Sequence, residues 1–311
     1  LNEAGREPHF YMVAAGEASK SLRSFERILD WLVEQRAERT EPIVALGGGV
    51  VGDLVGFVAA SYHRGAPLIQ VPTTLLAQVD SAIGGKTGIN HPHGKNLIGA
   101  FYQPRLTLAD PALLLTLPER AYREGWGEIV KYGMILDADL FELLEANVEA
   151  LRKRDAALLT RIVARCIALK MDVVERDELD SGLRNILNYG HTFGHALEAL
   201  SGYDRWLHGE AVSLGMEVAT RIAVARGLLS KKEAQRQRKL LAALGLPVEC
   251  EAIDVEAALE AMQRDKKVRD GRMRWVLPSC IGQVELYKDI DVAMVREAID
   301  DVCRIHEEMQ P

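Results

Sequence analysis

The feature that most constrains the fold is a glycine cluster, Gly-Gly-Gly-Val-Val-Gly at residues 47–52, between a strand-like run and a helical pattern. The preceding Ile43–Leu46 is short and apolar, Gly52–Ala60 has a helical pattern, and Leu68–Val71 resembles a second buried strand. This order is typical of a parallel α/β layer. The cluster fits Gly-x-Gly-x-x-Gly, whose glycines and helix N-terminus can accommodate a pyrophosphate. The motif alone is equally consistent with a plain tight turn.

The periodicity of apolar residues predicts two domains. Phe10–Ala14 is strand-like, Ser21–Gln35 predicts an amphipathic helix, and the polar, glycine-containing Asp80–Pro104 predicts a long functional loop. We predict an α/β, Rossmann-like dinucleotide-binding domain over 1–110 and a helical (all-α) metal-binding domain over 111–311. The second domain is predicted to contain helices at Glu124–Leu136, Ala138–Lys153, Ala157–Glu175, Tyr189–Leu200, Gly209–Arg226, Lys231–Leu244, Val255–Gln263 and Val292–Glu308, and one hairpin of Arg274–Leu277 with Val284–Tyr287.

Composition excludes several classes of partner. The net charge of −7 argues against nucleic acid, and no apolar run approaches the ~20 residues that cross a bilayer. Leu1–Tyr11 lacks the pattern of a secretory signal. The cysteines Cys166, Cys250, Cys280 and Cys303 lie far apart without a Cys-x-x-Cys motif. We therefore expect reduced, mostly buried thiols in a cytoplasmic protein.

Three histidines form a candidate metal site. His191 and His195 are four residues apart, so on a helix their Cβ atoms are neighbours at about 5–6 Å, and His208 follows in His-Gly-Glu. In an isolated helix, two core histidines with satisfied hydrogen bonds are the simpler interpretation. The pair is not His-Glu-x-x-His, so the general base of a metalloprotease is missing.

A catalytic zinc site takes three protein ligands and leaves one position open. Because no cysteine is near the histidines in sequence, the missing ligand is expected to be a carboxylate. Glu128 is a candidate because it lies in an otherwise apolar helical segment. Glu198 and Glu210 are competitors that spacing cannot exclude.

Basic side chains cluster in polar loops rather than along exposed helix faces. Lys86 and Lys95-Asn96 stand beside glycines, Arg64 follows a predicted helix, and Asp265-Lys266-Lys267 precedes the predicted hairpin. For any single lysine, solvent exposure at the surface is the simpler interpretation. Several of them beside glycine loops in an acidic protein favour a local site for a multiply charged anion.

Six motifs, in order over nearly the whole chain, resemble the 3-dehydroquinate synthase family of sugar phosphate cyclases. They lie at residues 47–53, 71–76, 80–87, 94–99, 128–131 and 184–195, and the segment 207–211 fits as well. The resemblance implies conversion of the seven-carbon acid phosphate DAHP to 3-dehydroquinate and phosphate, a carbon–oxygen lyase reaction of the shikimate pathway. It implies transient oxidation by NAD, phosphate elimination, re-reduction, ring opening and intramolecular aldol closure. It also implies a divalent metal, usually Zn²⁺ with Co²⁺ as the alternative, and a homodimer.

The resemblance also assigns residues. The metal ligands would be Glu128, His191 and His208. NAD would contact Glu17, Lys20, Gly49, Val50, Val51, Gly52, Asp53, Thr73, Thr74, Lys86, Lys95, Leu113 and Thr116. The substrate would contact Asp80, Lys86, Lys131, Lys170, Arg184, Asn188 and His195, with Arg64, Asn96, and Lys266 or Lys267 near its phosphate. On this assignment the metal held by the helical half faces the nicotinamide held by the α/β half.

Two other functions fit part of this pattern. A related cyclase, such as an aminodehydroquinate synthase, would keep most of these residues. A metal-dependent polyol dehydrogenase would need no phosphate-binding loop, so Lys86, Lys95 and Asn96 argue against it. Family members normally carry further strands before the position of Phe10. We therefore expect the first domain to lack strands, which would weaken NAD binding or leave a non-catalytic remnant.

Overall fold

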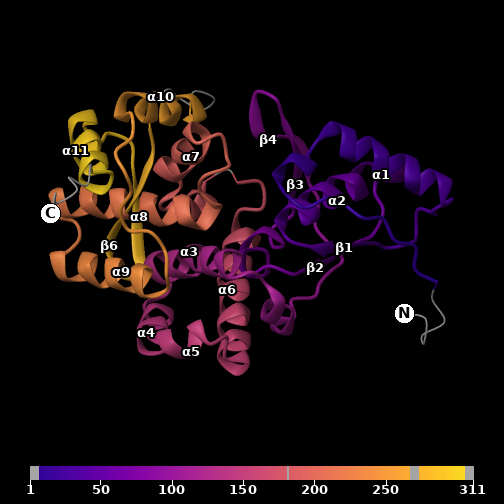
Figure 1. Ribbon diagram of the computed structural model, residues 1–311, viewed down its shortest axis with the longest axis horizontal. Coiled ribbons are helices and arrows are strands. Elements are labelled where there is room, and N and C mark those ends of the chain that lie inside the picture. Colours follow the sequence, from indigo (N-terminus) through magenta and orange to yellow (C-terminus); the bar gives the residue numbers. More distant parts are fainter. Residues whose placement is uncertain (1–6, 181, 267–272, 305–311) are drawn as a thin grey trace, which may run out of the picture. The chain divides into compact units, whose positions relative to one another are not determined.

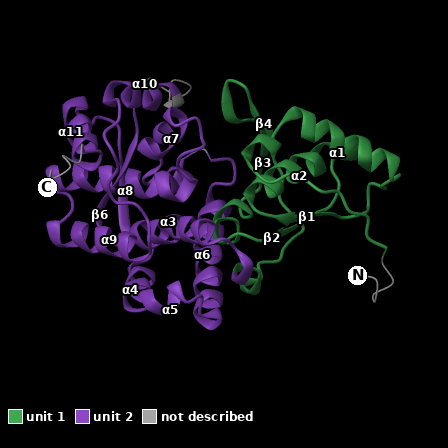
Figure 2. Ribbon diagram, viewed as in Figure 1, with its two compact units in different colours: residues 1–114 green, residues 115–311 purple. Residues whose placement is uncertain are grey.

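The computed structural model describes residues 7–180, 182–266 and 273–304. The chain divides into two compact units, Leu1–Leu114 (unit 1) and Leu115–Pro311 (unit 2), shown in Figures 1 and 2. Unit 1 is an α/β unit with a parallel sheet, and unit 2 is mostly helical. The predicted fold class is confirmed.

The sheet of unit 1 is parallel, with the strand order β1 (Ile43–Gly47), β2 (Leu68–Pro72) and β5 (Leu106–Thr107). The helix α2 (Gly49–Ser61) connects β1 to β2 and packs on one face of the sheet. This arrangement is the strand, helix and strand that the apolar runs predict. The helix begins at the glycine cluster itself, so the cluster forms the first turn of α2.

The helix α1 (Leu22–Glu34) covers α2 because its sequence is amphipathic. The hydroxyl oxygen of Ser21 accepts a hydrogen bond from the backbone N–H of Ser24 at 3.2 Å, which caps the helix at its start. Ile28 and Leu32 are buried against residues of α2. The predicted helix over 21–35 is confirmed with its first and last residues acting as caps.

Two predictions for unit 1 are wrong. Phe10–Ala14 forms no strand. The segment predicted as a long loop contains an antiparallel hairpin of β3 (Lys86–His91) and β4 (Gly94–Phe101). Glycines allow this pairing, because a Cβ at Gly99 would lie 2.0 Å from the backbone oxygen of Thr87. The glycines that suggested a flexible loop therefore bring two strands into close contact.

Unit 2 is built around α8, which is buried over most of its length and packs against α3, α7, α9 and α11 (Figure 1). A hairpin of β6 (Trp275–Cys280) and β7 (Gln283–Tyr287) confirms the predicted pair of strands. Within the described ranges, no helix combines the length and apolar character needed to cross a bilayer. The helices are α3 (Glu119–Ile135), α4 (Ala138–Ala146), α5 (Val148–Arg152), α6 (Ala156–Arg176), α7 (His191–Leu200), α8 (His208–Ala225), α9 (Lys231–Ala243), α10 (Val255–Lys266) and α11 (Val292–Val302), with the 3-10 helix η6 (Leu183–Asn188) before α7.

Two further predictions need correction in unit 2. The single helix predicted over 138–153 is divided at Asn147, whose side chain donates a hydrogen bond to the backbone oxygen of Leu143 at 2.8 Å. Cys250 and Cys303 form a disulfide, whereas all four cysteines were expected to be reduced thiols. The two lie 53 positions apart in sequence, and a backbone hydrogen bond from Cys250 to Val302 at 3.0 Å brings them together. That pairing is set by the packing of α11 and has no signal in cysteine spacing.

Candidate active site

Three helices of unit 2 bring the predicted metal ligands together. Glu128 lies within α3, while His191 and His208 are the first residues of α7 and α8. One ligand atom from each lies within 4.8 Å of the others. The Nε2 atoms of both histidines lie 3.4 Å from Oε1 of Glu128. These distances let the three side chains share one cation.

Glycines hold the three helices at this separation. A Cβ at Gly209 would lie 1.8 Å from the backbone oxygen of Glu124, so α8 and α3 are in backbone contact one residue after His208. A Cβ at Gly215 would lie 1.8 Å from the backbone oxygen of Gly190, which brings α8 against the start of α7. The site therefore depends on helix crossings that tolerate no side chain at these positions.

The electrostatics of the cluster suit a cation. Glu128 is fully buried, and its Oε2 accepts a hydrogen bond from Nζ of the buried Lys131. Burial lowers the pKa of His191 to about 3, so its imidazole is neutral at neutral pH. Burial alone would lower the pKa of His208, but hydrogen bonds with Glu128 and Glu198 raise it to about 10. Two carboxylates around one imidazole also favour a divalent cation.

The competing carboxylates have other partners. Glu210 makes two ion-pair contacts with Arg120, at 2.8 and 2.7 Å, and accepts a hydrogen bond from the backbone N–H of Leu207 at 2.9 Å. Glu210 therefore caps the N-terminus of α8. Glu198 lies on α7, with Oε2 3.4 Å from Nδ1 of His208. Of the three candidates, Glu128 alone contacts both His191 and His208 among the contacts of the described residues.

The donor set fits a transition-metal ion. One nitrogen from each of two imidazoles and one carboxylate oxygen are a ligand set of catalytic zinc sites, which leave a position open for substrate or water. Mg²⁺ and Ca²⁺ prefer oxygen ligands throughout. The side chains of Glu128, His191 and His208 therefore suit a first-row transition-metal ion such as Zn²⁺ better than Mg²⁺ or Ca²⁺.

The predicted substrate residues of unit 2 differ in exposure. Lys170 on α6 and Arg184 on η6 are buried, whereas Asn188 and His195 are exposed. The ring of His195 lies 5.3 Å from that of His191 and 6.1 Å from that of His208, measured between ring centroids. His195 is thus beside the group formed by Glu128, His191 and His208 and reaches solvent.

Two supporting groups of unit 2 were not predicted. The backbone oxygen of Tyr189 lies 3.0 Å from Nδ1 of His191. The Tyr189 hydroxyl is held by Thr220 and Gln237, at 2.7 and 2.6 Å. Asp177 accepts backbone hydrogen bonds from Gly182 and Arg184, both at 2.8 Å. Every residue has a backbone carbonyl, so the sequence cannot indicate the role of the one at Tyr189. Asp177 could not be distinguished by sequence from the other acidic residues.

In unit 1, threonine and serine side chains lie against the glycine turn. A Cβ at Gly48 would lie 2.9 Å from Cγ2 of Thr74, and one at Gly49 would lie 2.9 Å from Oγ of Ser81. The backbone N–H of Thr73 donates to the oxygen of Gly47 at 2.9 Å. The predicted NAD residues of this turn are therefore neighbours. They are Gly49, Val50, Val51, Gly52 and Asp53 in the first turn of α2, and Thr73 and Thr74 after β2.

Lys20 joins residues predicted for the cofactor and for the phosphate. Its ammonium lies 2.7 Å from Oδ2 of Asp53 and 2.5 Å from Oδ1 of Asn96, and the residue is only 5% exposed. Glu17 lies 3.7 Å from the same ammonium and accepts a hydrogen bond from Asn90 at 2.8 Å. One polar cluster thus links three elements of unit 1. They are the short 3-10 helix Glu17–Ser19 (η2), the start of α2 and the hairpin of β3 and β4.

The remaining predicted residues belong partly to unit 1 and partly to unit 2. Asp80 lies in a π-helical turn, Ala77–Ser81 (η4), and Lys86 is exposed at the start of β3. The exposed Arg64 has a positive φ of 63°. Lys95 is half-buried on β4, Leu113 and Thr116 lie on the 3-10 helix Pro111–Thr116 (η5), Lys266 is the last residue of α10, and Lys267 lies outside the described residues.

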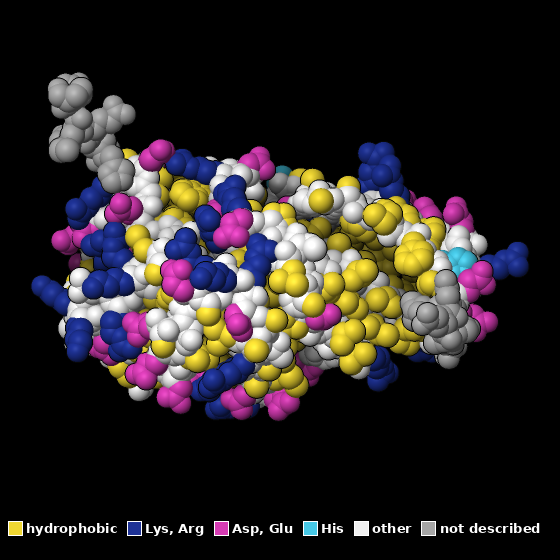
Figure 3. All heavy atoms as spheres, turned by 60° about the horizontal axis from the view of Figure 1, so that its bottom comes forward, with side chains coloured by type: hydrophobic (Ala, Val, Ile, Leu, Met, Phe, Trp, Pro, Cys, Tyr) yellow, Lys and Arg dark blue, Asp and Glu magenta, His cyan; other side chains and the backbone are white. Residues whose placement is uncertain are grey.

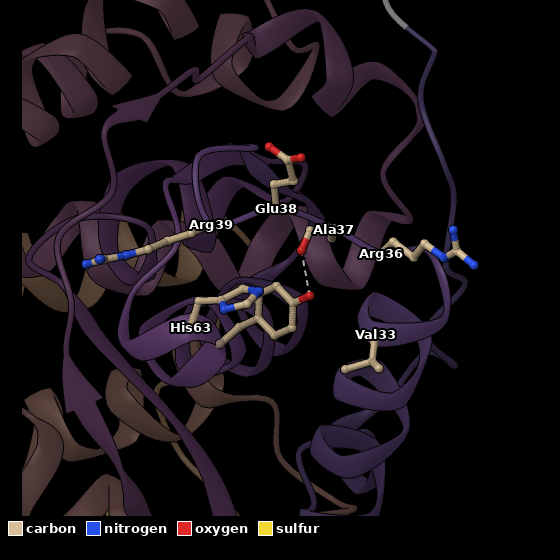
Figure 4. Close-up of a pocket in the computed structure, with 7 residues that line it drawn as sticks. Val33, Arg36, Ala37, Glu38, Arg39 and His63 are labelled. Atoms are coloured by element: carbon tan, nitrogen blue, oxygen red, sulfur yellow. Dashed lines mark hydrogen bonds between the residues drawn. The ribbon is translucent and has the colours of Figure 1, made fainter.

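A surface cavity of unit 1 contains none of the predicted residues. It has a volume of about 450 Å³ and is shown in Figure 4. The hydroxyl of Tyr62, one of the lining residues, donates a hydrogen bond to the backbone oxygen of Ala37 at 2.7 Å, drawn as a dashed line in Figure 4. The cavity is lined by Val33, Arg36, Ala37, Glu38, Arg39, Tyr62 and His63.

An α/β unit with a glycine turn, followed by a helical unit with a histidine–carboxylate cluster, defines a class of nucleotide- and metal-dependent enzymes. Residues 10–124 match the family description "3-dehydroquinate synthase N-terminal", and residues 125–268 match "3-dehydroquinate synthase C-terminal". The chain belongs to the 3-dehydroquinate synthase family. The predicted family and its lyase reaction in the shikimate pathway are confirmed.

Relatives and solved structures agree with this membership. A 3-dehydroquinate synthase of Gloeobacter violaceus is 52% identical over 301 residues, which cover 96% of this chain and 83% of the relative. The structure of a 2-epi-5-epi-valiolone synthase from Streptomyces hygroscopicus, with NAD⁺ and Zn²⁺ bound, has a TM-score of 0.88 at 31% identity, covering 93% of this chain and 81% of that one. A 2-deoxy-scyllo-inosose synthase with carbaglucose-6-phosphate, NAD⁺ and Co²⁺ has a TM-score of 0.84 at 30% identity, with the same coverage.

Proposed function

We propose that this chain converts DAHP to 3-dehydroquinate and phosphate with NAD and a divalent metal, preferably Zn²⁺. The observation that carries the proposal is the meeting of Glu128, His191 and His208 in one group of ligand atoms. Membership of the family supplies the substrate. The NAD⁺ and Zn²⁺ of the related valiolone synthase support the cofactors.

The metal site acts through the charge and geometry of its side chains. A Zn²⁺ ion in this site would lower the pKa of substrate hydroxyl groups, and NAD would accept and later return a hydride. Lys131 is held on Oε2 of Glu128, so Oε1 remains directed toward the two imidazoles. Because His191 is neutral, its Nε2 can donate a lone pair to the ion.

The substrate is proposed to bind through its two anionic ends. Lys170, Arg184 and Asn188 would hold the carboxylate, and Arg64, Lys86 and Asn96 the phosphate. The burial of Lys170 and Arg184 supports the first assignment, because a buried cation favours an anionic partner. His195 is exposed beside the metal cluster, so we assign it proton transfer to or from the substrate. Asp80, Lys131, and Lys266 or Lys267 complete the proposed contacts.

The nucleotide is proposed to bind at the glycine turn. The first turn of α2 offers backbone N–H groups to a pyrophosphate, since the first residues of a helix have no intrahelical acceptor. Thr73 and Thr74 lie against this turn. The polar cluster around Lys20 supports placing Glu17 and Asp53 on the ribose side. Lys86, Lys95, Leu113 and Thr116 remain proposed contacts.

The deciding experiment measures phosphate release and cofactor absorbance together. With DAHP, NAD and Zn²⁺, we expect stoichiometric phosphate with no accumulation of NADH. Accumulating NADH would instead indicate a polyol dehydrogenase. A preference for the aminated analogue of DAHP would indicate an aminodehydroquinate synthase. Absence of turnover with every substrate, despite full metal loading, would contradict catalysis.

The metal assignment has its own test. His191→Ala and Glu128→Ala should abolish phosphate release and zinc content while the helical circular-dichroism signal is retained. Lys232→Ala, an exposed change in unit 2, is the matched control and should leave both unchanged. Full turnover by zinc-free His191→Ala would overturn the assignment. A homodimer remains a prediction from the family resemblance, and a cytoplasmic location remains a prediction from the cysteine pattern.

A further inference from the structure

Glu198 is a buried carboxylate that the proposed reaction does not use. It lies on α7, seven residues after His191, and is 6% exposed. A buried carboxylate is unfavourable unless hydrogen-bonding partners compensate for its lost hydration. His208 is such a partner, with Nδ1 3.4 Å from Oε2 of Glu198. The contact joins the end of α7 to the first residue of α8.

His208 is held between two carboxylates through its two nitrogens. Nε2 faces Oε1 of Glu128 and Nδ1 faces Oε2 of Glu198, both at 3.4 Å. A neutral imidazole carries one proton, and the nitrogen with that proton cannot bind a metal. With the proton on Nδ1, facing Glu198, the lone pair of Nε2 is available on the side of Glu128. The side chains thus select the tautomer that coordination requires.

The two histidines of the site are anchored by different groups. Nδ1 of His191 is 3.0 Å from the backbone oxygen of Tyr189, whereas His208 has a carboxylate in the equivalent position. An anionic acceptor makes a stronger hydrogen bond and raises the basicity of the imidazole as a ligand. His208 also follows directly on the turn between α7 and α8, with no preceding helical residue to orient it.

We propose that Glu198 is a positioning residue that orients His208 through its Nδ1 and strengthens the metal site without binding the metal. The inference rests on the proposed metal site. Partners of this kind typically contribute a factor of about 10–100 to metal affinity. His195, Glu198 and His208 also form a second group of ligand atoms within 4.8 Å. The alternative to a positioning role is that Glu198 is itself a ligand of a second metal ion.

The test uses the full chain loaded with Zn²⁺ or Co²⁺. We expect Glu198→Ala to raise the Zn²⁺ dissociation constant about 10- to 100-fold, measured by competition with a chromophoric chelator. Glu198→Gln keeps the size and an acceptor oxygen, so its dissociation constant should lie between those of Glu198→Ala and the unchanged chain. The visible absorption of the Co²⁺ form should change in both variants, because the ligand field depends on the orientation of His208. The matched control is Glu149→Gln, whose side chain is 77% exposed in the same unit.

Two outcomes would overturn the inference. Unchanged Zn²⁺ affinity and an unchanged Co²⁺ spectrum in both variants would show that Glu198 does not position His208. Two Zn²⁺ ions per chain, falling to one in Glu198→Ala, would make Glu198 a ligand. If Glu198→Ala does not fold, Glu198→Gln alone decides. His191→Ala, measured in parallel, separates the two proposals, because normal Zn²⁺ binding by that variant would contradict the metal site itself.

Discussion

The two units hold their proposed site residues in contrasting ways. In unit 2, Glu128, Lys131, Lys170 and Arg184 are all less than 5% exposed and project from packed helices. In unit 1, most such residues lie on a hairpin and on turns, and Lys86 is exposed. In unit 2, the positions of these side chains are therefore fixed by helix packing. In unit 1, they depend mainly on a hairpin and on turns.

The sheet of unit 1 shows the same difference in its apolar surface. The helix α2 covers the face that carries Ala45, whereas on the opposite face Val44, Leu46 and Leu106 are 48%, 60% and 52% exposed. In Figure 3, hydrophobic side chains gather on the surface formed by unit 1. Sheets with parallel strands usually have both faces covered. The face with Val44, Leu46 and Leu106 is an exception to this rule. Substitutions on this face should therefore lower the free energy of unfolding less than substitutions of buried residues in unit 2.

The largest effect on the candidate site is expected for Gly209→Ala in unit 2. Its new Cβ would lie 1.8 Å from the backbone oxygen of Glu124, so α3 and α8 must separate. We expect a loss of about 3 kcal/mol in the free energy of unfolding, with loss of bound zinc although no ligand is changed. Denaturant unfolding and zinc analysis measure both. Lys232→Ala, an exposed change in the same unit, is the control and should stay within about 0.5 kcal/mol.

A smaller effect, confined to activity, is expected for Lys86→Ala in unit 1. Loss of one charged contact with phosphate corresponds to about 1.5–3 kcal/mol, or roughly a 10- to 100-fold fall in kcat/KM. The melting temperature should not change, because the residue is exposed. Steady-state kinetics with DAHP provide the measurement. Equal kinetic effects from Lys86→Ala and the surface change Lys232→Ala would refute the phosphate assignment.

The third prediction concerns the pH dependence of unit 2. Burial alone would raise the pKa of Asp137, but hydrogen bonds from Arg165 and from the backbone N–H of Leu140 hold it below the ordinary value of 3.8. The stabilisation is therefore fully present above the unfolded-state pKa and is lost as pH falls through the lower folded-state pKa. Asp137→Asn should destabilise the protein by about 1–2 kcal/mol at pH 7. In unfolding experiments, the difference should shrink below about pH 4; a constant difference down to pH 2 would contradict it.

The smallest effect is expected for Leu46→Ala on the open face of the unit 1 sheet. Because the side chain is 60% exposed, we expect a loss below about 1 kcal/mol. Leu214→Ala, at a fully buried position of α8, should cost about 2–5 kcal/mol. Chemical denaturation of both variants compares the two units directly. Similar losses would mean that the open face is covered in solution.

Local periodicity was enough to predict most elements. The amphipathic pattern of residues 21–35 and the run Ile43–Leu46 give a helix and a strand close to the observed bounds. It failed at residues 80–104, where glycines suggested a loop but allow a close strand pairing. It also failed at Cys250 and Cys303, whose pairing depends on how α11 packs. The first error concerns a local hairpin whose glycines allow close strand contact. Only the second concerns segments distant in sequence.

The sequence by itself determined which chemical groups are available: a glycine turn after a strand, histidines at helical spacing, and motifs that resemble one family. Only the tertiary structure decided that Glu128 contacts both His191 and His208, while Glu210 caps α8 and Glu198 contacts Nδ1 of His208. The physical reason is that spacing along one helix fixes neighbours on that helix alone. Which carboxylate meets the histidines depends on how closely α3, α7 and α8 cross, and backbone contacts at glycines set that distance.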